Sequence, residues 1–223
     1  MSLTTVAIAN AKGGVLKTTL TTALAVRATK ESAMVAMFDL NSDQGNLTQW
    51  WTVRGEPMNP RLIYDLENIP ADAREAERNG FEWLFIDTPP LEMDLIEQSI
   101  AIADLVIIPV RTSMFDVSTI EPVVAMCRRH RKEFAFLLAA IDSRFKSLLP
   151  QTIAALRTDG PILENQISYR IAYVQAVTVG KTGAEINKEL AGEVDALWQE
   201  VRGLAASAKA AHAALIRRRA ADV

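Results

Sequence analysis

Residues 12–19 combine glycines, lysines and threonines in an order that suits the binding of phosphate groups. They read Lys-Gly-Gly-Val-Leu-Lys-Thr-Thr and follow an apolar run at 6–9. Glycines let a backbone curl so that its N–H groups converge on an anion, and the first turn of a following helix adds the positive end of its dipole. In such a loop we expect Lys17 to reach the terminal phosphates and Thr18 to coordinate Mg²⁺. The predicted phosphate-binding residues are Gly13, Gly14, Val15, Leu16, Lys17, Thr18 and Thr19.

The loop departs from the usual phosphate-loop pattern, GxxxxGK[ST], at both glycines. Ala11 takes the place of the first glycine, and Leu16 takes the place of the glycine before the lysine. A leucine resists a positive φ and brings a bulky side chain where a phosphate should approach the backbone closely. We therefore expect nucleotide binding to be weakened.

Three aspartates each close a predicted strand. They are Asp39, Asp87 and Asp142. Because ligands of parallel α/β sheets bind at the carboxyl ends of the strands, the three side chains are expected at the ligand-binding edge. Asp87 ends the apolar run 83–86, and its carboxylate fits a Mg²⁺ site, either directly or through water. Asp142 is expected to contact the nucleotide.

The elements that must position these residues alternate along the chain. Continuous apolar runs, typical of strands buried on both faces, occur at 4–10, 33–39, 83–87, 105–110 and 134–142. Helical spacing occurs at 18–31, 92–103 and 117–131. This rhythm predicts a doubly wound, mostly parallel α/β sheet within one domain, 1–223. Residues 161–163 are a candidate sixth strand, and 184–221 are expected to form one long helix or two shorter ones.

Composition excludes several classes of protein. The 223 residues are 49% hydrophobic and 23% charged, with a formal net charge of −3, so any nucleic-acid binding must use a local patch. The single cysteine, Cys127, excludes a disulfide framework within the chain and a cysteine-based metal cluster. No apolar run reaches the roughly 18 residues that a membrane span needs. We expect a cytoplasmic protein that does not bind membranes.

Together these segments resemble the ParA/MinD family of deviant Walker A ATPases, in particular short ParA-like partition proteins without an N-terminal DNA-reading domain. The most specific element is Lys12, directly before the two glycines; the likeness continues at 83–90, 103–110, 140–144 and 169–182. The resemblance implies a P-loop NTPase fold with ATP and Mg²⁺ as ligands. It also implies a homodimer that encloses ATP, in which Lys12 has a catalytic role at the γ-phosphate of the partner subunit.

The segment 38–48 resembles the family's Asp-x-Asp-Pro-Gln-Gly motif, whose second aspartate activates the attacking water. Asp39 matches the first aspartate. Counted from Asp39, the second position holds Asn41, which can orient a water but cannot accept its proton. Counted back from Gln44, it holds Asp43. Asp39 and Asp43 are therefore the candidate catalytic carboxylates, and the alternative is that no residue replaces the second aspartate.

Two basic clusters, 128–132 and 217–219, end predicted helices, where cations also offset the helix dipole. The resemblance implies non-specific DNA binding by the ATP-bound dimer, for which Arg217, Arg218 and Arg219 are the candidates. It further implies a ParB-like stimulating partner and association with the nucleoid. A membrane-targeting helix at 184–221 is disfavoured because its apolar face is mainly alanine.

Two interpretations of function remain. In the first, the chain is an ATPase switch for the segregation of plasmids or mobile elements, impaired by Leu16. In the second, it binds nucleotide too weakly to use it and serves as a scaffold or a DNA-binding protein. A positioning ATPase with a protein cargo is a variant of the first.

Overall fold

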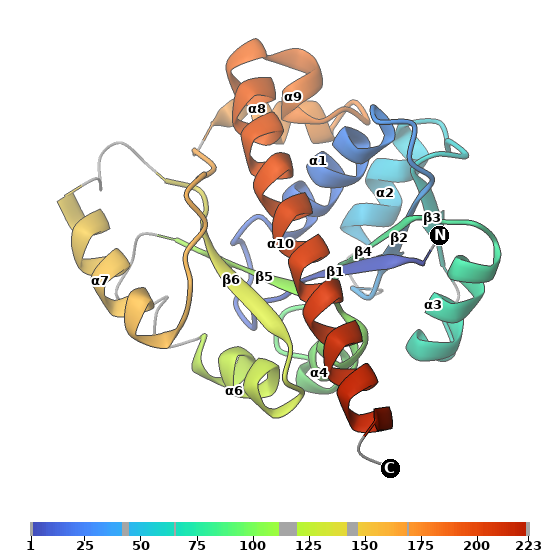
Figure 1. The fold of residues 1–223 in the computed structure, drawn as a ribbon. Helices are drawn as coiled ribbons and strands as arrows, with labels where there is room; N and C mark the ends of the chain where they lie inside the picture. Colours follow the sequence, from blue (N-terminus) through green and yellow to red (C-terminus); the bar gives the residue numbers. More distant parts are fainter. Residues whose placement is uncertain are drawn as a thin grey trace.

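The strands form one all-parallel sheet with the order β3-β2-β4-β1-β5-β6 (Figure 1). The computed structural model describes residues 2–41, 45–64, 66–111, 120–141, 147–168 and 170–221, with side chains as far as 214. The strands are β1 (Thr4–Ile8), β2 (Val35–Asp39), β3 (Arg61–Ile63), β4 (Trp83–Asp87), β5 (Leu105–Val110) and β6 (Glu133–Leu138). The predicted doubly wound parallel sheet is confirmed.

Helices cover both faces of the sheet. One face carries α1 (Lys17–Thr29), α2 (Asn46–Val53), α8 (Ile171–Val177) and α10 (Lys188–Ala221), with the short α9 (Gly183–Ile186) between the last two. The other face carries α3 (Ile69–Arg78), α4 (Met93–Ile102), α6 (Glu121–Arg129) and α7 (Leu149–Asp159). Figure 1 shows α10 as the long helix that crosses the sheet and ends near the C-terminus.

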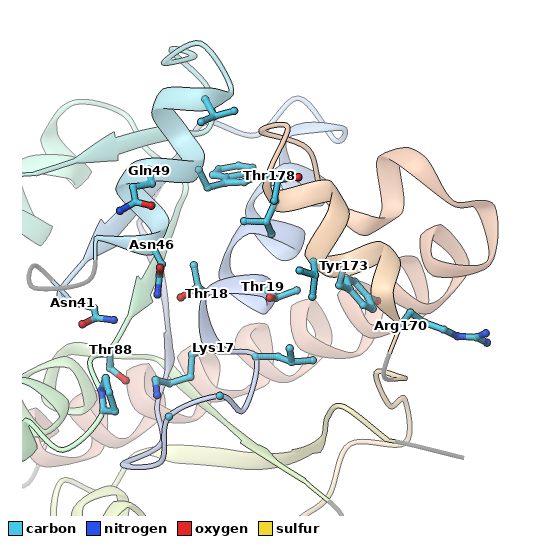
Figure 2. Close-up of a pocket in the computed structure, with 18 residues that line it drawn as sticks. Lys17, Thr18, Thr19, Asn41, Asn46, Gln49, Thr88, Arg170, Tyr173 and Thr178 are labelled. Carbon is cyan, nitrogen blue, oxygen red and sulfur yellow. The ribbon is translucent and has the colours of Figure 1, made fainter. Parts of the chain in front are cut away.

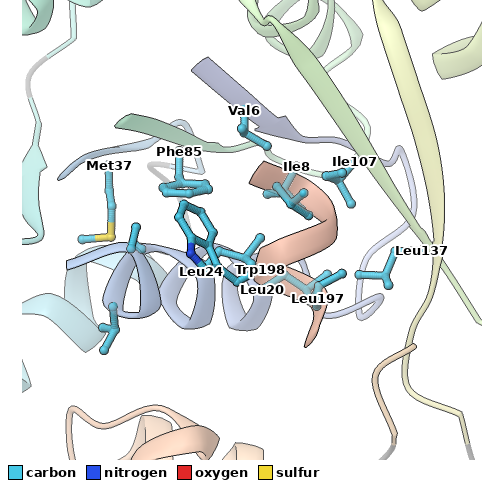
Figure 3. Close-up of a cluster of buried hydrophobic side chains, with 14 of the residues drawn as sticks. Val6, Ile8, Leu20, Leu24, Met37, Phe85, Ile107, Leu137, Leu197 and Trp198 are labelled. Carbon is cyan, nitrogen blue, oxygen red and sulfur yellow. The ribbon is translucent and has the colours of Figure 1, made fainter. Parts of the chain in front are cut away.

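Successive residues of the central strand feed two separate cores. Val6 and Ile8 point into the core under α1 and α10, whereas Ala7, and Ala9 directly after the strand, point into the core under α4 and α6. This alternation follows from the two-residue period of a strand. In the first core, Leu20 and Leu24 of α1 meet Trp198 of α10 (Figure 3). The Trp198 ring lies 4.8 Å from that of Trp83, edge to face, which fixes α10 on the sheet.

The expectation of a sixth strand at 161–163 is wrong, because the sixth strand is the three-residue β3. Residues 161–167 instead run beside β6 as a covering segment. The amide of Phe136 donates to Pro161 O, and the amides of Leu163 and Ile167 donate to carbonyls of β6, but only Ile162 forms a bridge. Pro161 has no N–H to give, which limits further pairing. At the opposite edge β3 is short, and Arg61 is exposed.

The predicted helical segment 184–221 is two helices of unequal length, α9 and the 34-residue α10. The break lies at Asn187, whose side-chain oxygen accepts hydrogen bonds from the amides of Glu189 and Leu190. Asn187 therefore caps the new helix, a role for which asparagine is well suited. Among the helices of the described residues, we find none with the length and apolar character to cross a bilayer.

The strand order creates a crevice at the carboxyl ends of β1 and β4. These strands are neighbours, but α1 leaves β1 on one face of the sheet and α4 leaves β4 on the other. Ligands of open α/β sheets bind at such a divergence. In the ladder, Asp87 lies opposite Ile8 on one side and Asp39 on the other, so both carboxylates reach this crevice edge.

Candidate functional site

Asn10 anchors the loop between β1 and α1. Its side-chain amide donates to Pro109 O of β5 at 2.8 Å, and its side-chain oxygen accepts the amide of Lys12 at 2.8 Å. Asn10 is 1% exposed, so these bonds are shielded from water. The sequence reasoning treated Asn10 only as the end of a strand. The sequence feature that could have indicated this anchoring role is a polar residue at the end of an otherwise apolar run.

Lys17 lies inside the loop. Its ammonium Nζ donates to the carbonyl oxygen of Lys12 at 2.9 Å, so the side chain folds back across the glycines. Burial lowers the pKa of Lys17, and the nearby Asp87 opposes this shift. A buried ammonium that donates to a single carbonyl among the described residues is suited to phosphate oxygens, which offer it stronger, charge-assisted bonds.

Leu16 adopts the left-handed conformation that the loop requires at this position. Its φ is 69° and its ψ 25°, and Gly14 has a φ of 72°. The Leu16 carbonyl accepts the amide of Leu20 at 2.9 Å, so the residue begins α1 as its N-cap. A left-handed backbone costs a residue with a Cβ about 1–2 kcal/mol. The leucine side chain packs against the core below α1 and also borders the cavity described below.

Thr18 and Asp87 form a pair that fits a magnesium ion. The Thr18 hydroxyl donates to Asp87 Oδ2 at 2.6 Å, while the buried Asp87 Oδ1 has no hydrogen-bond partner within the described residues. Burial raises the pKa of Asp87 to about 7; the Thr18 bond and Lys17 act against this, and Asp39 adds to it. Mg²⁺ prefers hydroxyl and carboxylate oxygens together with phosphate oxygens. The pair therefore supplies two suitable ligands, one of them a carboxylate oxygen without a hydrogen-bond donor among the described residues.

Asp39 is held by hydrogen bonds at the start of α2. Its carboxylate accepts the amide of Asn41 at 3.1 Å, and the amide and hydroxyl of Thr48 at 2.9 and 2.8 Å. These bonds fix the entry to α2, whose N-cap is Gly45 with a φ of 54°. Sequence reasoning did not foresee this structural role. The catalytic role expected of Asp39 stays a prediction.

A cavity of about 620 Å³ opens above the loop (Figure 2). Its floor is the start of α1, one wall is α2 and the other is α8. Volumes of this size are typical of small-ligand sites. The cavity is lined by Gly13, Gly14, Leu16, Lys17, Thr18, Thr19, Asn41, Asn46, Gln49, Trp50, Val53, Thr88, Pro90, Arg170, Tyr173, Val174, Val177 and Thr178. In Figure 2 the guanidinium of Arg170 points away from the cavity.

The structure brings together most of the predicted loop residues and leaves others outside the description. Val15 is buried, so its backbone alone can serve a ligand. Lys12 lies at the loop, held through its backbone, and its role toward a partner subunit stays a prediction. Asp43 and Asp142 lie outside the described residues, as do the side chains of Arg217, Arg218 and Arg219.

The residues that sequence reasoning missed come mainly from α2 and α8. Neither helix was predicted, and both contribute to the cavity. Of the two basic clusters, 128–132 makes structural contacts: Arg129 and His130 both meet Glu97 at 2.8 Å, and Arg128 donates to Asp159 O. This cluster therefore ties α6 to its neighbours.

Known proteins with similar sequences match nearly the whole chain. The maintenance of carboxysome distribution protein A (McdA) of Halothiobacillus neapolitanus is 27% identical over 211 residues, 88% of this chain and 95% of that protein. The chromosome-partitioning ATPase Soj of Thermus thermophilus is 28% identical over 243 residues, 87% of this chain and 96% of that protein.

A solved structure shares the fold. The ATP complex of a McdA variant from Cyanothece has a TM-score of 0.65 and 20% identity, and the match covers 88% of this chain and 97% of that chain. The family model described as the CobQ/CobB/MinD/ParA nucleotide binding domain matches residues 6–182, which include the loop, Asp87 and both cavity walls. The chain therefore belongs to the CobQ/CobB/MinD/ParA nucleotide-binding domain family.

Proposed function

We propose that this chain is an ATP-dependent switch that positions or partitions a cargo. Its family is a nucleotide-binding one, and its relatives are named for chromosome partitioning and carboxysome distribution. The observation that carries the proposal is the pair formed by Thr18 of α1 and Asp87 of β4; among the described residues the buried Asp87 Oδ1 has no hydrogen-bond partner, and Lys17 is nearby. A magnesium-bound triphosphate would satisfy both the carboxylate and the ammonium.

In this proposal each residue of the loop has a distinct task. The amides of 13–19 and the Lys17 ammonium bind the phosphates, and Thr18 and Asp87 hold Mg²⁺, which neutralises charge on the transferred phosphoryl group. Asn41 borders the cavity and can orient a water, while Asp43 is the candidate to accept its proton. Lys12 extends to the phosphates of a facing copy and stabilises the charge that develops there.

The finer parts of the proposal concern partners. Two copies form an ATP-dependent homodimer, which binds DNA non-specifically through Arg217–Arg219 and so associates with the nucleoid. A ParB-like protein stimulates hydrolysis and releases the dimer. The carboxysome-distribution relative supports a second candidate cargo, a protein assembly in place of DNA. In either case the switch itself is the same.

Leu16 indicates that this switch binds ATP more weakly than a loop with glycine at the same position would. Its φ of 69° requires the conformation that glycine adopts at low cost, and its side chain borders the cavity. Replacing Leu16 by Gly removes the side chain from the phosphate-facing loop. We expect Leu16→Gly to bind ATP at least about tenfold more tightly than the parent chain, a gain of about 1.4 kcal/mol.

Calorimetric titration with ATP and Mg²⁺ tests both the site and the effect of Leu16. Lys17→Ala in the Leu16→Gly background is the control and should abolish most of the heat of binding. Equal affinity of the parent chain and Leu16→Gly would refute the steric effect of Leu16. No binding by either protein at millimolar ATP would refute the proposed function.

A further inference from the structure

The two walls of the cavity are joined at their far ends by a compact group of contacts, here called the α2–α9 clasp: Trp50, Arg54, Gly180, Lys181 and Glu185. Arg54 donates to Glu185 through both terminal guanidinium nitrogens, Nη1 at 2.9 Å and Nη2 at 2.8 Å, and Nη1 also donates to Gly180 O at 2.9 Å. The indole N–H of Trp50 donates to Lys181 O at 3.0 Å. The clasp therefore joins the end of α2 to the α8–α9 connection.

The clasp is built for a fixed geometry. The Arg54 guanidinium lies over the Trp50 ring, 5.2 Å from its centre, and Trp50 is 1% exposed. Glu185 also accepts bonds from the amide and hydroxyl of Thr182, which forms a capping box at the start of α9. A bidentate arginine–carboxylate pair is directional as well as strong. Arg54 is thus held by both Glu185 and the Trp50 ring, and Glu185 is held by both Arg54 and Thr182.

Gly180 makes the close approach possible. Its φ is +67°, and a Cβ placed on it would lie 2.5 Å from the backbone nitrogen of Arg54. The α8–α9 connection therefore rests directly on the backbone at the end of α2. A side chain at Gly180 would push the two walls apart.

The opposite ends of both walls are anchored elsewhere. The start of α2 is held by Asp39 through Thr48, next to Asn41 and the phosphate loop. The segment before α8 is held by Glu193 of α10, which accepts the hydroxyl of Ser168 at 2.7 Å. With those ends held, the clasp determines how far apart α2 and α8 stand across the cavity.

We propose that Arg54 and Glu185 are positioning residues for the nucleotide, because they hold the α2 and α8 walls at the separation that binding requires. The inference rests on the proposed function, since it assigns the cavity to ATP. Trp50 carries the effect: the same side chain lines the cavity and bonds to Lys181 O. When the clasp is broken, the walls separate and contacts to the nucleotide are lost, whereas the phosphate loop keeps its shape.

The test measures the dissociation constant of N-methylanthraniloyl-ATP with Mg²⁺ by fluorescence, in the parent chain and in Leu16→Gly. Arg54→Ala is expected to raise this constant about tenfold. Arg54→Lys keeps the charge but loses the bidentate contact to Glu185, and it is expected to raise the constant about fivefold. Glu185→Gln retains an acceptor for Thr182 and is expected to raise it about threefold. The double variant Arg54→Ala/Glu185→Gln should have about the same dissociation constant as Arg54→Ala alone, because both substitutions remove the same Arg54–Glu185 interaction.

Arg129→Ala is the matched control. It removes an Arg–Glu pair of the same 2.8 Å length between α6 and α4, among helices on the other face of the sheet. Its dissociation constant should stay within twofold of the parent value. Hydrogen exchange without nucleotide provides an independent readout: in Arg54→Ala, peptides from α2 and α8 should exchange faster together, while the peptide covering 10–20 should not change.

The outcomes separate this inference from the proposed function. Binding by the parent chain or by Leu16→Gly with a dissociation constant that Arg54→Ala does not alter, or exchange in α2 and α8 that is unaltered, overturns the inference and leaves the function standing. A tenfold loss in Arg129→Ala as well would reduce the effect to general destabilisation and also overturn it. Absence of binding in both the parent and Leu16→Gly overturns the proposed function, and the inference with it.

Discussion

Asp87 carries a carboxyl group whose charge the folded chain does not accommodate well. It is fully buried, lies opposite Asp39 in the ladder and keeps one oxygen unpartnered within the described residues. Its pKa of about 7 lies far above the ordinary 3.8. At pH values between the ordinary 3.8 and about 7, the folded state therefore holds a proton that the unfolded state has already lost. The stability this gives is fully present below the unfolded pKa and is lost as the pH rises through about 7.

Asp87→Asn should remove this pH dependence. Relative to the variant, we expect the free energy of unfolding of the parent to fall by on the order of 1–3 kcal/mol between about pH 5 and about pH 8 without nucleotide. Urea unfolding at several pH values measures the difference. Thr18→Val is a useful companion, since it removes the donor but keeps the carboxyl. Parallel curves for the parent and Asp87→Asn would contradict the raised pKa.

At this scale the sequence predicts the residues whose chemistry is local. Lys17 and Thr18 follow from spacing within one loop, and Asp87 from its place after an apolar run. Asn10 and Arg54 could not be predicted, because their partners, Pro109 and Glu185, are 99 and 131 residues away in the chain. The pattern places Leu16 where a glycine is usual, and the structure gives Leu16 the positive φ, 69°, that glycine adopts more easily.

Helices and strands were predictable where they are long and apolar. The five strands expected from apolar runs are present in the sheet; β4 and β5 have the predicted bounds, and β1, β2 and β6 have shifted ends. β3 has three residues, α2 eight and α8 seven, too few for hydrophobic periodicity to identify them. Tertiary contacts stabilise them instead: Leu62 and Trp50 are almost fully buried in the core under α1. Of these missed elements, α2 and α8 are the ones that complete the cavity.

Gly180 and Gly192 provide a matched pair for testing how the elements fit together. Gly180→Ala places a side chain at a φ of +67° and 2.5 Å from Arg54 N. We expect it to lower the free energy of unfolding by at least about 2 kcal/mol, from backbone strain and the clash together. Thermal and urea unfolding report the change.

Gly192→Ala is the control, because Gly192 lies within α10 and has open space around its Cβ position. Alanine is the better helix former, so this variant should be more stable by about 0.5–1 kcal/mol. A loss for Gly180→Ala no larger than about 0.5 kcal/mol would mean that the connection can move away from α2 at little cost.

At the scale of the whole molecule, Lys12 links the loop to assembly. Its backbone is fixed by Asn10 and Lys17, so Lys12→Ala should leave the loop and nucleotide binding by one chain largely intact. We expect the variant to lose the ATP-dependent dimer because the cation that reaches the facing phosphates is gone. Sedimentation with ATP and Mg²⁺, in the Leu16→Gly background, measures this. Lys12→Arg should retain part of the dimer; an intact dimer in Lys12→Ala would exclude the proposed role.

The end of α10 is where DNA binding is expected. Replacing Arg217, Arg218 and Arg219 by Glu should weaken binding to DNA of any sequence and reduce the slope of log affinity against log salt. Fluorescence anisotropy at several salt concentrations provides both values. Arg128→Glu serves as the comparison, because Arg128 already bonds to Asp159 O. An unaltered slope in the triple variant would assign these arginines to the end of the helix alone.

The two edge strands of the sheet determine whether copies of the chain can associate through strand pairing. Along β6 the edge is occupied by residues 161–167, and β3 offers only three residues with a charged Arg61 among them. Long uncovered strand edges allow chains to pair edge to edge and aggregate, whereas short, charged or covered edges resist this aggregation. Within the described residues both edges of the sheet are thus protected, and we expect copies gathered at high concentration to remain individual molecules.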